Sequence, residues 1–350
     1  MQRSRKSGLK LRARRAAAYA KTPVLWTPTI PTVLSIIGSI ELLVFLLFPE
    51  LRNNFFFMAF VGLSIPFAAW LFVYWKIYLS VFTTPFSEKA VVEDSRWQRV
   101  SFQGWGDEEM DAYILPSESS SKDLVLYLHG YTSSLSRGES RCLHLHSLGM
   151  NIIGLDQRGF GNQHGRMDWT LLKVVADAEA LLESAPEHFE FTPERLWIYG
   201  HSMGGFITIR LASHASGWWE HKLQGIILES PVTSFPKLMD EKLPGRMVMA
   251  RPWVRHVLRR EHERIHPDLS IRYANTELPY MGIPETQILV MQSKEDDTLG
   301  RDHFDLLLKH LSPELGVDSE IHIISGMPHT STFDHPDRRM ILENWLEGMI

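Results

Sequence analysis

The sequence predicts an α/β fold in which a mostly parallel sheet is covered by helices on both faces. Short apolar runs with the length of buried strands recur along the chain, at residues 124–128, 151–155, 196–200, 225–228 and 287–291, and an alternating strand-like segment follows at 320–324. Segments with the apolar spacing of helices separate several of these runs, at residues 140–148, 171–182 and 206–212. Strands that alternate with helices favour a parallel sheet, and ligands of such sheets bind at the carboxyl ends of the strands.

Residues 1–29 form a basic arm. Eight Lys or Arg and no acidic residue precede Pro23, whereas the 350-residue chain carries a net charge of −5. The remaining 28 basic and 41 acidic residues give the rest of the chain a charge of about −13. Because a domain that acidic binds nucleic acid poorly, we expect no nucleic-acid partner and a different role for the arm.

Two long apolar stretches follow the arm, at about 30–48 and 54–75, within a predicted membrane region over 30–82. The first has 19 residues interrupted by Glu41, and the second has 22 residues without a charge. Each is long enough to cross a hydrocarbon core of about 30 Å at about 1.5 Å per residue. We therefore expect a transmembrane helical hairpin. A buried or interfacial helix is the alternative for the first stretch, because a charge such as Glu41 is costly at the bilayer centre.

The basic arm sets the expected orientation of this hairpin. Lys and Arg residues that flank a span stay in the cytoplasm. Two crossings would return Lys76 and everything after it to the cytoplasmic side. We therefore expect a multi-pass membrane protein with two spans and a cytoplasmic C-terminal domain. If only the second stretch spans, that domain lies outside.

Residues 97–350 form the predicted α/β domain. It opens with an antiparallel hairpin over 99–115, whose strands flank the polar turn 104–107. From about 231 to 284 the strand–helix alternation stops, and apolar residues at helical spacing lie among nine Lys or Arg residues. We expect this insertion to form a cap over the site. A basic amphipathic cap can lie on an anionic membrane surface, and a solvated charged helix face explains the pattern equally well.

The most informative run of the sequence is Gly200-His201-Ser202-Met203-Gly204, which lies between a strand-like and a helix-like segment. It fits the G-x-S-x-G pattern, in which a strained strand-to-helix turn exposes a serine hydroxyl. The two glycines let backbone pass close to the turn, and the start of the helix directs N–H groups toward a developing oxyanion. The run therefore predicts a serine nucleophile; a glycine-rich turn with an incidental serine is the alternative.

An activated serine needs a base, and the base needs an orienting carboxylate. Asp296 lies in a polar loop after the run 287–291, and His329 lies after the run 320–324. The chain order is therefore serine, acid, histidine, which differs from the orders of chymotrypsin and subtilisin.

From about residue 97 to its end, the chain resembles the α/β-hydrolase superfamily in its lipase- and esterase-like branch. The matching motifs are His129-Gly130, Asp156-x-Arg158-Gly159-x-Gly161 and Gly200-x-Ser202-x-Gly204-Gly205. This resemblance implies an α/β-hydrolase fold with a cap insertion.

The resemblance also implies a role for each residue of the site. Ser202 would be the nucleophile, His329 the general base and acid, and Asp296 the group that orients the histidine. The backbone N–H groups of Met203 and Tyr131 would form the oxyanion hole.

One departure from the superfamily pattern leaves the identity of the acid open. Many relatives have a glycine three residues before the acid, where this chain has Ser293. The neighbouring Asp297 is the first alternative to Asp296. Glu229, at the end of the run 225–228, is the second.

The remaining histidines have simpler interpretations. His201 is expected to line the pocket or to pack rather than to react. The pairs His144/His146 and His262/His266 lack a convincing carboxylate context, so we expect no metal.

Together these features predict a membrane-anchored serine hydrolase that uses no cofactor. We expect a small-molecule or lipid ester as substrate, with an acylglycerol or a lysophospholipid favoured because the anchor holds the pocket near lipid. A peptidase or amidase of the same fold is one alternative. A catalytically silent scaffold that binds a membrane partner is another, although the intact serine, acid and histidine argue against it.

Overall fold

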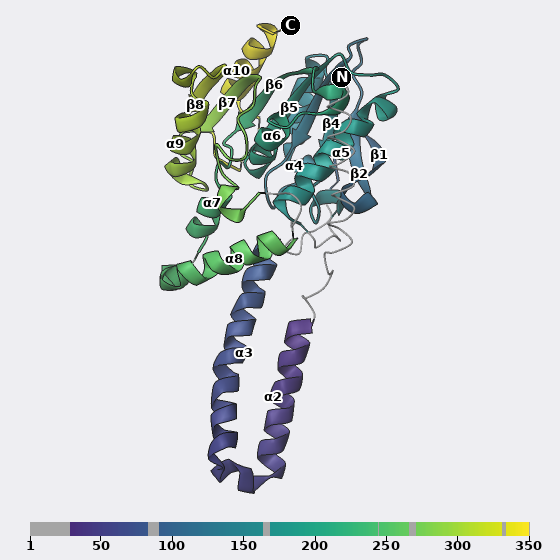
Figure 1. Ribbon diagram of the computed structural model, residues 1–350. Helices are drawn as coiled ribbons and strands as arrows, with labels where there is room; N and C mark the ends of the chain where they lie inside the picture. Colours follow the sequence, from purple (N-terminus) through teal and green to yellow (C-terminus); the bar gives the residue numbers. More distant parts are fainter. Residues whose placement is uncertain are drawn as a thin grey trace.

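The computed structural model shows a domain built around a central sheet, with a stalk of two helices projecting from it (Figure 1). The structure describes residues 29–82, 91–163, 169–243, 245–265, 271–330 and 334–349. The predicted basic arm up to residue 28, and His266 of the second histidine pair, lie outside the described residues.

The sheet has eight strands in the order β1-β2-β4-β3-β5-β6-β7-β8. The strands are β1 (Gln98–Gln103), β2 (Glu109–Leu115), β3 (Asp123–Leu128), β4 (Asn151–Leu155), β5 (Arg195–His201), β6 (Leu223–Glu229), β7 (Gln287–Ser293) and β8 (Ser319–Ile324). β2 pairs antiparallel with β1 and with β4, and all other neighbours pair in parallel. The expectation of a mostly parallel sheet that opens with an antiparallel hairpin is confirmed.

Helices cover both faces of the sheet. They are α4 (Leu135–Ser147), α5 (Leu171–Phe189), α6 (Met203–Ala212), α9 (Gly300–Leu311) and α10 (Pro336–Glu347). Alternate residues of β3 enter different cores: Leu124 and Leu126 pack with α5, α6 and α9, whereas Val125 and Tyr127 pack with α4 and α10. Because such strands are buried on both faces, they read as continuous apolar runs in the sequence.

Short 3-10 helices complete the architecture. They are η1 (Pro49–Asn53), η2 (Trp105–Asp107), η3 (Gly161–Gln163), η4 (Gly217–Trp219), η5 (Gly245–Ala250), η6 (Tyr273–Asn275) and η7 (Pro313–Leu315). The first of these makes the turn at the far end of the stalk (Figure 1).

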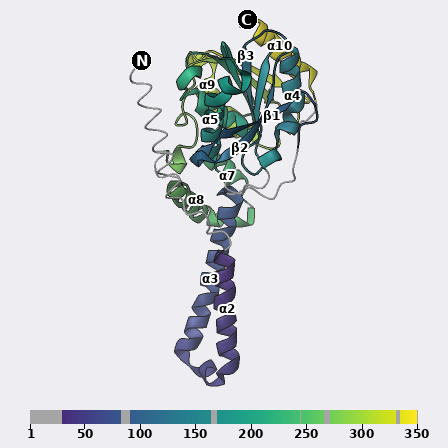
Figure 2. The same cartoon turned by 90° about the vertical axis from the view of Figure 1, so that its right-hand side faces the viewer.

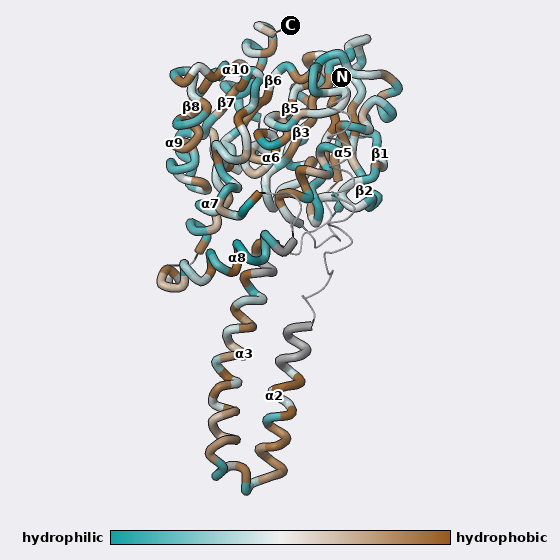
Figure 3. Tube along the Cα trace, viewed as in Figure 1, coloured by the Kyte–Doolittle hydropathy of each residue, from teal (hydrophilic) through white to brown (hydrophobic). Residues whose placement is uncertain are grey.

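The stalk consists of α2 (Thr29–Leu47) and α3 (Phe55–Phe82), which run side by side in opposite directions (Figures 1 and 2). Most of both helices is apolar (Figure 3). Among the described residues, one segment, Phe55–Ile77, is long and apolar enough to cross a membrane, and its most apolar part is not buried inside the protein. The apolar part of α2 is shorter, at Ser35–Leu47. One apolar helix is thus a candidate anchor, and spanning by both helices stays a prediction.

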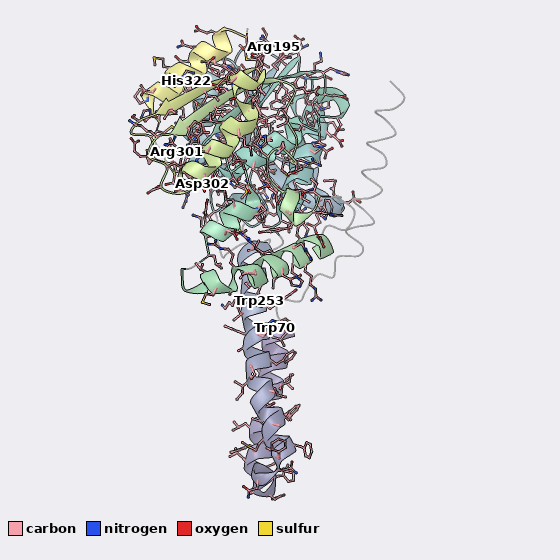
Figure 4. The ribbon with its side chains drawn as sticks, turned by 60° about the vertical axis from the view of Figure 1, so that its left-hand side comes forward. Trp70, Arg195, Trp253, Arg301, Asp302 and His322 are labelled. Atoms are coloured by element: carbon pink, nitrogen blue, oxygen red, sulfur yellow. The ribbon has the colours of Figure 1, made fainter. Side chains whose placement is uncertain are left out.

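The last turns of α3 belong to the domain rather than to the stalk. Ile77 and Val81 are buried in the core that also contains α5. The helix therefore continues to Phe82, past the end of the predicted stretch at residue 75. Nearby, the ring of Trp70 lies 6.5 Å from that of Trp253, so the aromatic residues at this end of α3 contact the domain (Figure 4).

The predicted cap insertion contains two α-helices. Between β6 and β7 the chain forms α7 (Phe235–Glu241) and α8 (Arg251–Ile265), which lie between the sheet and the stalk (Figure 1). On α8, Val254 and Val257 are buried against the core while Arg255 and Arg259 are exposed. The hydroxyl of Tyr74 on α3 donates to the buried Glu261 of α8, which fixes the stalk to this helix.

Candidate active site

Ser202 occupies a strained turn between β5 and α6. Its φ of 54° and ψ of −116° are unusual for a residue other than glycine. The turn is possible because its neighbours lack a side chain: a Cβ on Gly204 would lie 2.0 Å from the Leu128 carbonyl oxygen. A Cβ on Gly200 would lie 2.4 Å from the Gly204 carbonyl oxygen. The sharp turn therefore requires glycine on both sides and lifts the serine hydroxyl away from the sheet.

Three side chains from three loops meet at the carboxyl edge of the sheet. Ser202 Oγ lies 2.9 Å from His329 Nε2, and His329 Nδ1 lies 2.8 Å from Asp296 Oδ2. The other oxygen of Asp296 accepts the backbone N–H groups of Thr298 and Leu299 at 3.0 and 2.9 Å. With Nδ1 donating to the carboxylate, Nε2 is left to accept the serine proton. Burial raises the pKa of Asp296, but the hydrogen bond and charge of His329, together with the two backbone N–H groups, outweigh it and hold that pKa below its ordinary value.

The two alternative acids lie in other environments. Asp297 is exposed, and its carboxylate accepts the Thr298 hydroxyl at 3.3 Å. Glu229 is buried and accepts Arg141 Nε at 2.8 Å, while the Tyr199 hydroxyl donates to the same carboxylate. Burial alone would raise the pKa of Glu229, but the Arg141 guanidinium holds it well below its usual range. Of the three predicted acids, Asp296 is the one whose carboxylate contacts the histidine.

The loop that carries His329 is held by contacts that the sequence did not reveal. His201, next to the serine, donates from Nε2 to the His329 carbonyl oxygen at 2.7 Å. Ser293, where many relatives have glycine, donates its hydroxyl to the Met327 carbonyl oxygen at 2.5 Å. The residue that departs from the superfamily pattern thus ties the acid loop to the histidine loop.

The turn after β3 packs directly against the serine. A Cβ on Gly130 would lie 3.1 Å from Ser202 Cβ, so the backbone approaches the nucleophile closely here. The ring of the next residue, Tyr131, packs edge-on against Phe160 and Trp169 with centroids 5.2 and 4.9 Å away. These contacts fix the position of the backbone that the sequence predicts as one half of the oxyanion hole.

A pocket of about 210 Å³ lies in front of the serine. Met203 and Tyr131, the two predicted oxyanion residues, line it together with Ser202, His201 and His329. Met203 is the first residue of α6, and the first N–H groups of a helix have no partner within the helix.

Two buried histidines beside the serine, His129 and His201, have pKa values that favour the neutral ring. His129 Nδ1 donates to the Gly130 carbonyl oxygen at 2.7 Å, and its Nε2 accepts the Gln157 N–H at 3.0 Å, so a proton on Nε2 would break a contact. Burial lowers the pKa of His129 from 6.5 to about 4 and that of His201 from 6.5 to about 3.

Acidification should therefore destabilise the folded protein. Below about pH 6.5 these two histidines bind protons in the unfolded state. In the folded state His129 stays neutral down to about pH 4 and His201 down to about pH 3. The contribution of each neutral histidine to the free energy of unfolding is fully present above pH 6.5. It falls by about 1.4 kcal/mol per histidine for each pH unit below that value. Thermal unfolding between pH 7.5 and pH 5 should show this fall, and His201→Gln should make it shallower. An unchanged slope in the variant would contradict the neutral buried His201.

Among the described residues, no group of three or more His, Cys, Asp or Glu side chains is placed to hold a metal ion. Of the first predicted histidine pair, His146 Nε2 donates to the Pro116 carbonyl oxygen at 2.9 Å. His144 Nε2 lies 3.4 Å from Glu343.

Comparisons with known proteins agree with this fold. The family model described as serine aminopeptidase, S33, matches residues 119–304, just over half of the chain. The protein bem46 of Schizosaccharomyces pombe is 26% identical over 159 residues, which cover 44% of this chain and 51% of that protein. The chain thus spans about half the length of the first curated relatives it matches.

Two further relatives have names that describe an activity. A putative monoglyceride lipase of Schizosaccharomyces pombe is 30% identical over 118 residues, covering 31% of this chain and 29% of that protein. The solved structure of an esterase from Pyrococcus furiosus superposes with a TM-score of 0.55 at 16% identity, covering 77% of this chain and 98% of that one. At this identity the likeness shows the fold alone.

Proposed function

Because the chain belongs to the serine aminopeptidase (S33) family of α/β-hydrolases, we propose that it is a membrane-anchored serine hydrolase that cleaves a carboxylic ester. The observation that carries this proposal is the hydrogen-bonded series Asp296–His329–Ser202, which ends in a serine on a strained turn. A solvent-exposed serine of a loop would have neither a base nor a reason for this backbone conformation.

The first half of the proposed reaction forms an acyl-enzyme. His329 Nε2, 2.9 Å from Ser202 Oγ, takes the hydroxyl proton while the oxygen attacks the carbonyl carbon of the ester. The anionic Asp296 stabilises the imidazolium that results and keeps the ring in the required orientation. The imidazolium then gives its proton to the alkoxide that leaves, and the C–O bond of the ester breaks.

The second half returns the enzyme to its starting state. A water molecule gives a proton to His329 and attacks the acyl carbon, and the proton passes to Ser202 as the acid leaves. In both halves the backbone N–H groups of Met203 and Tyr131 would stabilise the oxyanion. Their position against the pocket wall supports this role.

The choice between an ester and an amide is tested by a matched pair of substrates. The putative monoglyceride lipase among the relatives favours an ester, whereas the family's description favours a peptidase. We expect the full chain to hydrolyse 4-nitrophenyl butanoate and to leave the corresponding 4-nitroanilide nearly untouched. Comparable kcat/KM values for the two, both lost in Ser202→Ala, would instead identify a peptidase or amidase. Equal background rates in the wild type and Ser202→Ala would favour the silent scaffold.

We infer that the stalk anchors the enzyme in the membrane. Phe55–Ile77 is apolar and long enough to span, most of it lies outside the core, and α2 runs beside it in the opposite direction (Figure 1). A stalk inserted as a hairpin would leave the domain on the same side as residue 29, the side predicted to be cytoplasmic. Glu41 of α2 is half-buried in the stalk, and its Oε1 has no hydrogen-bond partner among the described residues, so a charge at this position stays costly in a membrane.

The protein should therefore stay in the membrane pellet after washes with high salt and with alkaline carbonate. Insertion of apolar helices resists both treatments, whereas electrostatic attachment to lipid is released by salt. Alkaline phosphatase fused to the C-terminus should be inactive, and a fluorescent reporter at the same position should be bright. An active phosphatase fusion would contradict the two-span hairpin and indicate one span with an external domain.

A further inference from the structure

The pocket in front of Ser202 has a cationic wall. Among the described residues that line it, none is Asp or Glu, whereas Arg137 and Arg141 of α4 and Lys242 after α7 all contribute. Arg141 is neutralised by its buried ion pair with Glu229. Two positive charges therefore remain for a ligand.

The two remaining cations lack a carboxylate partner within the described part of the chain. Arg137 is exposed and forms no ion pair there. Lys242 is also exposed, and its ammonium donates to the Thr298 carbonyl oxygen at 3.2 Å, which holds it over the pocket without neutralising it. By contrast, Lys237, one turn earlier on α7, pairs with Asp302 at 2.7 Å. The cations at the pocket are thus left uncompensated while their neighbour is paired.

The rest of the pocket divides into donors and apolar surface. The lining residues with hydroxyl groups other than Ser202 are Tyr127, Tyr131, Thr132, Ser133, Thr298 and Thr330. The apolar ones are Met203, Val232, Leu238 and Leu299. The volume of about 210 Å³ is below the roughly 300–1,000 Å³ typical of ligand sites, so any anion bound here lies only a few bonds from the reacting carbonyl.

We propose that the preferred substrate is an ester that carries an anionic group, a phosphate or a carboxylate, close to the scissile bond, and that Arg137 and Lys242 bind this group. The inference rests on the proposed hydrolase function and narrows its substrate class. The apolar residues then face the acyl chain, and a neutral ester of the same size lacks the charge-assisted hydrogen bonds.

Two matched pairs of substrates test the proposal and separate the two kinds of anion. The first pair is 1-hexanoylglycerol 3-phosphate and 1-hexanoylglycerol. The second is mono-4-nitrophenyl glutarate and 4-nitrophenyl pentanoate. We expect kcat/KM to favour the anionic member by about tenfold or more in at least one pair, and the preference to shrink as ionic strength rises. A preference below fivefold in both pairs would overturn the proposal.

Variants then test the assignment to the two residues. Arg137→Gln with Lys242→Gln should reduce the anionic preference to below about threefold, mainly through KM. Lys237→Gln and Arg301→Gln are matched controls outside the pocket, and both should keep the full preference. Arg301 and Asp302, the partner of Lys237, lie on the outer side of the domain (Figure 4). A preference that survives the double variant would overturn the assignment.

Failure of this inference is distinguishable from failure of the proposed function. Equal cleavage of neutral and anionic esters, abolished by Ser202→Ala, would remove the anionic substrate class and keep the serine hydrolase. Cleavage unaffected by Ser202→Ala would remove both. If none of the four esters turns over, the two glycerol esters can be compared as competitors of fluorophosphonate labelling at Ser202. The proposal predicts that 1-hexanoylglycerol 3-phosphate slows labelling more than 1-hexanoylglycerol does. Equal protection by the two esters would overturn the proposal.

Discussion

Replacing Ser202 with alanine should lower kcat for 4-nitrophenyl butanoate by about 10⁴-fold or more and leave the fold intact. Loss of the nucleophile in a hydrogen-bonded triad costs orders of magnitude in rate because no other group can form the acyl-enzyme. The fold should survive, since the backbone contacts of the turn, such as Ser202 N–H to the Glu229 carbonyl oxygen at 2.9 Å, do not involve the hydroxyl.

A matched control for this variant is Ser213→Ala, because Ser213 caps the C-terminal end of α6 as Ser202 caps its N-terminal end. The Ser213 hydroxyl donates to the Ile209 carbonyl oxygen at 2.7 Å, at the end of α6 away from the pocket. Its loss should change kcat by less than about twofold and thermal stability only slightly. Ester hydrolysis by Ser202→Ala above one hundredth of the wild-type rate would show that the nucleophile lies elsewhere.

Asp296→Asn should lower kcat by about 10³- to 10⁴-fold with little change in KM. The amide cannot accept the His329 Nδ1–H as the carboxylate does, so the ring loses its tautomer and the imidazolium loses its stabilising charge. Asp297→Asn is the isosteric control, and it should change kcat by less than about threefold because the exposed Asp297 contacts Thr298 and not the histidine. The reverse ranking of these two variants would make Asp297 the acid.

Glu229, the third predicted acid, can be distinguished from Asp296 and Asp297 because its replacement should lower the stability of the fold. Glu229→Gln leaves the buried Arg141 without a counter-charge, which costs about 3–5 kcal/mol in buried pairs. The unfolding temperature should therefore fall sharply. A stable Glu229→Gln variant that loses kcat while Asp296→Asn keeps it would make Glu229 the acid.

The sequence predicted the mostly parallel sheet, for a physical reason. Central parallel strands such as β3, β5 and β7 are buried on both faces and therefore appear as unbroken apolar runs. Ser202 comes directly after β5, Asp296 lies in the loop after β7 and His329 in the loop after the edge strand β8. The carboxyl ends of these parallel strands share one edge of the sheet. Local pattern was therefore enough to place Ser202, Asp296 and His329 at the same edge.

Contacts between distant segments could not be predicted in this way. The hydrogen bond from His201 to the His329 carbonyl oxygen joins residues 128 positions apart, and the one from Ser293 to Met327 joins residues 34 apart. Neither leaves a periodic signal in the sequence. For the same reason the run of apolar residues that ends at residue 75 did not reveal that α3 continues into the core of the domain through Ile77 and Val81.

The role proposed for the two pocket cations could not be predicted from the sequence either. Arg137 looks like an ordinary exposed residue of an amphipathic helix, and Lys242 looks like one of many basic residues in the insertion. Only the fold brings them to one wall beside Ser202. Sequence alone offered no charged residue that could be assigned to substrate recognition.

The role of Ser202 as an activated nucleophile is tested most directly by covalent labelling of the full-length protein with a fluorophosphonate, followed by mass spectrometry of its peptides. A serine activated by a neighbouring histidine reacts with such a probe, whereas an ordinary serine does not. We expect one adduct, on Ser202, with labelling slowed strongly in Asp296→Asn and absent in Ser202→Ala. An unlabelled wild-type protein, or an adduct on another residue that persists in Ser202→Ala, would contradict this role.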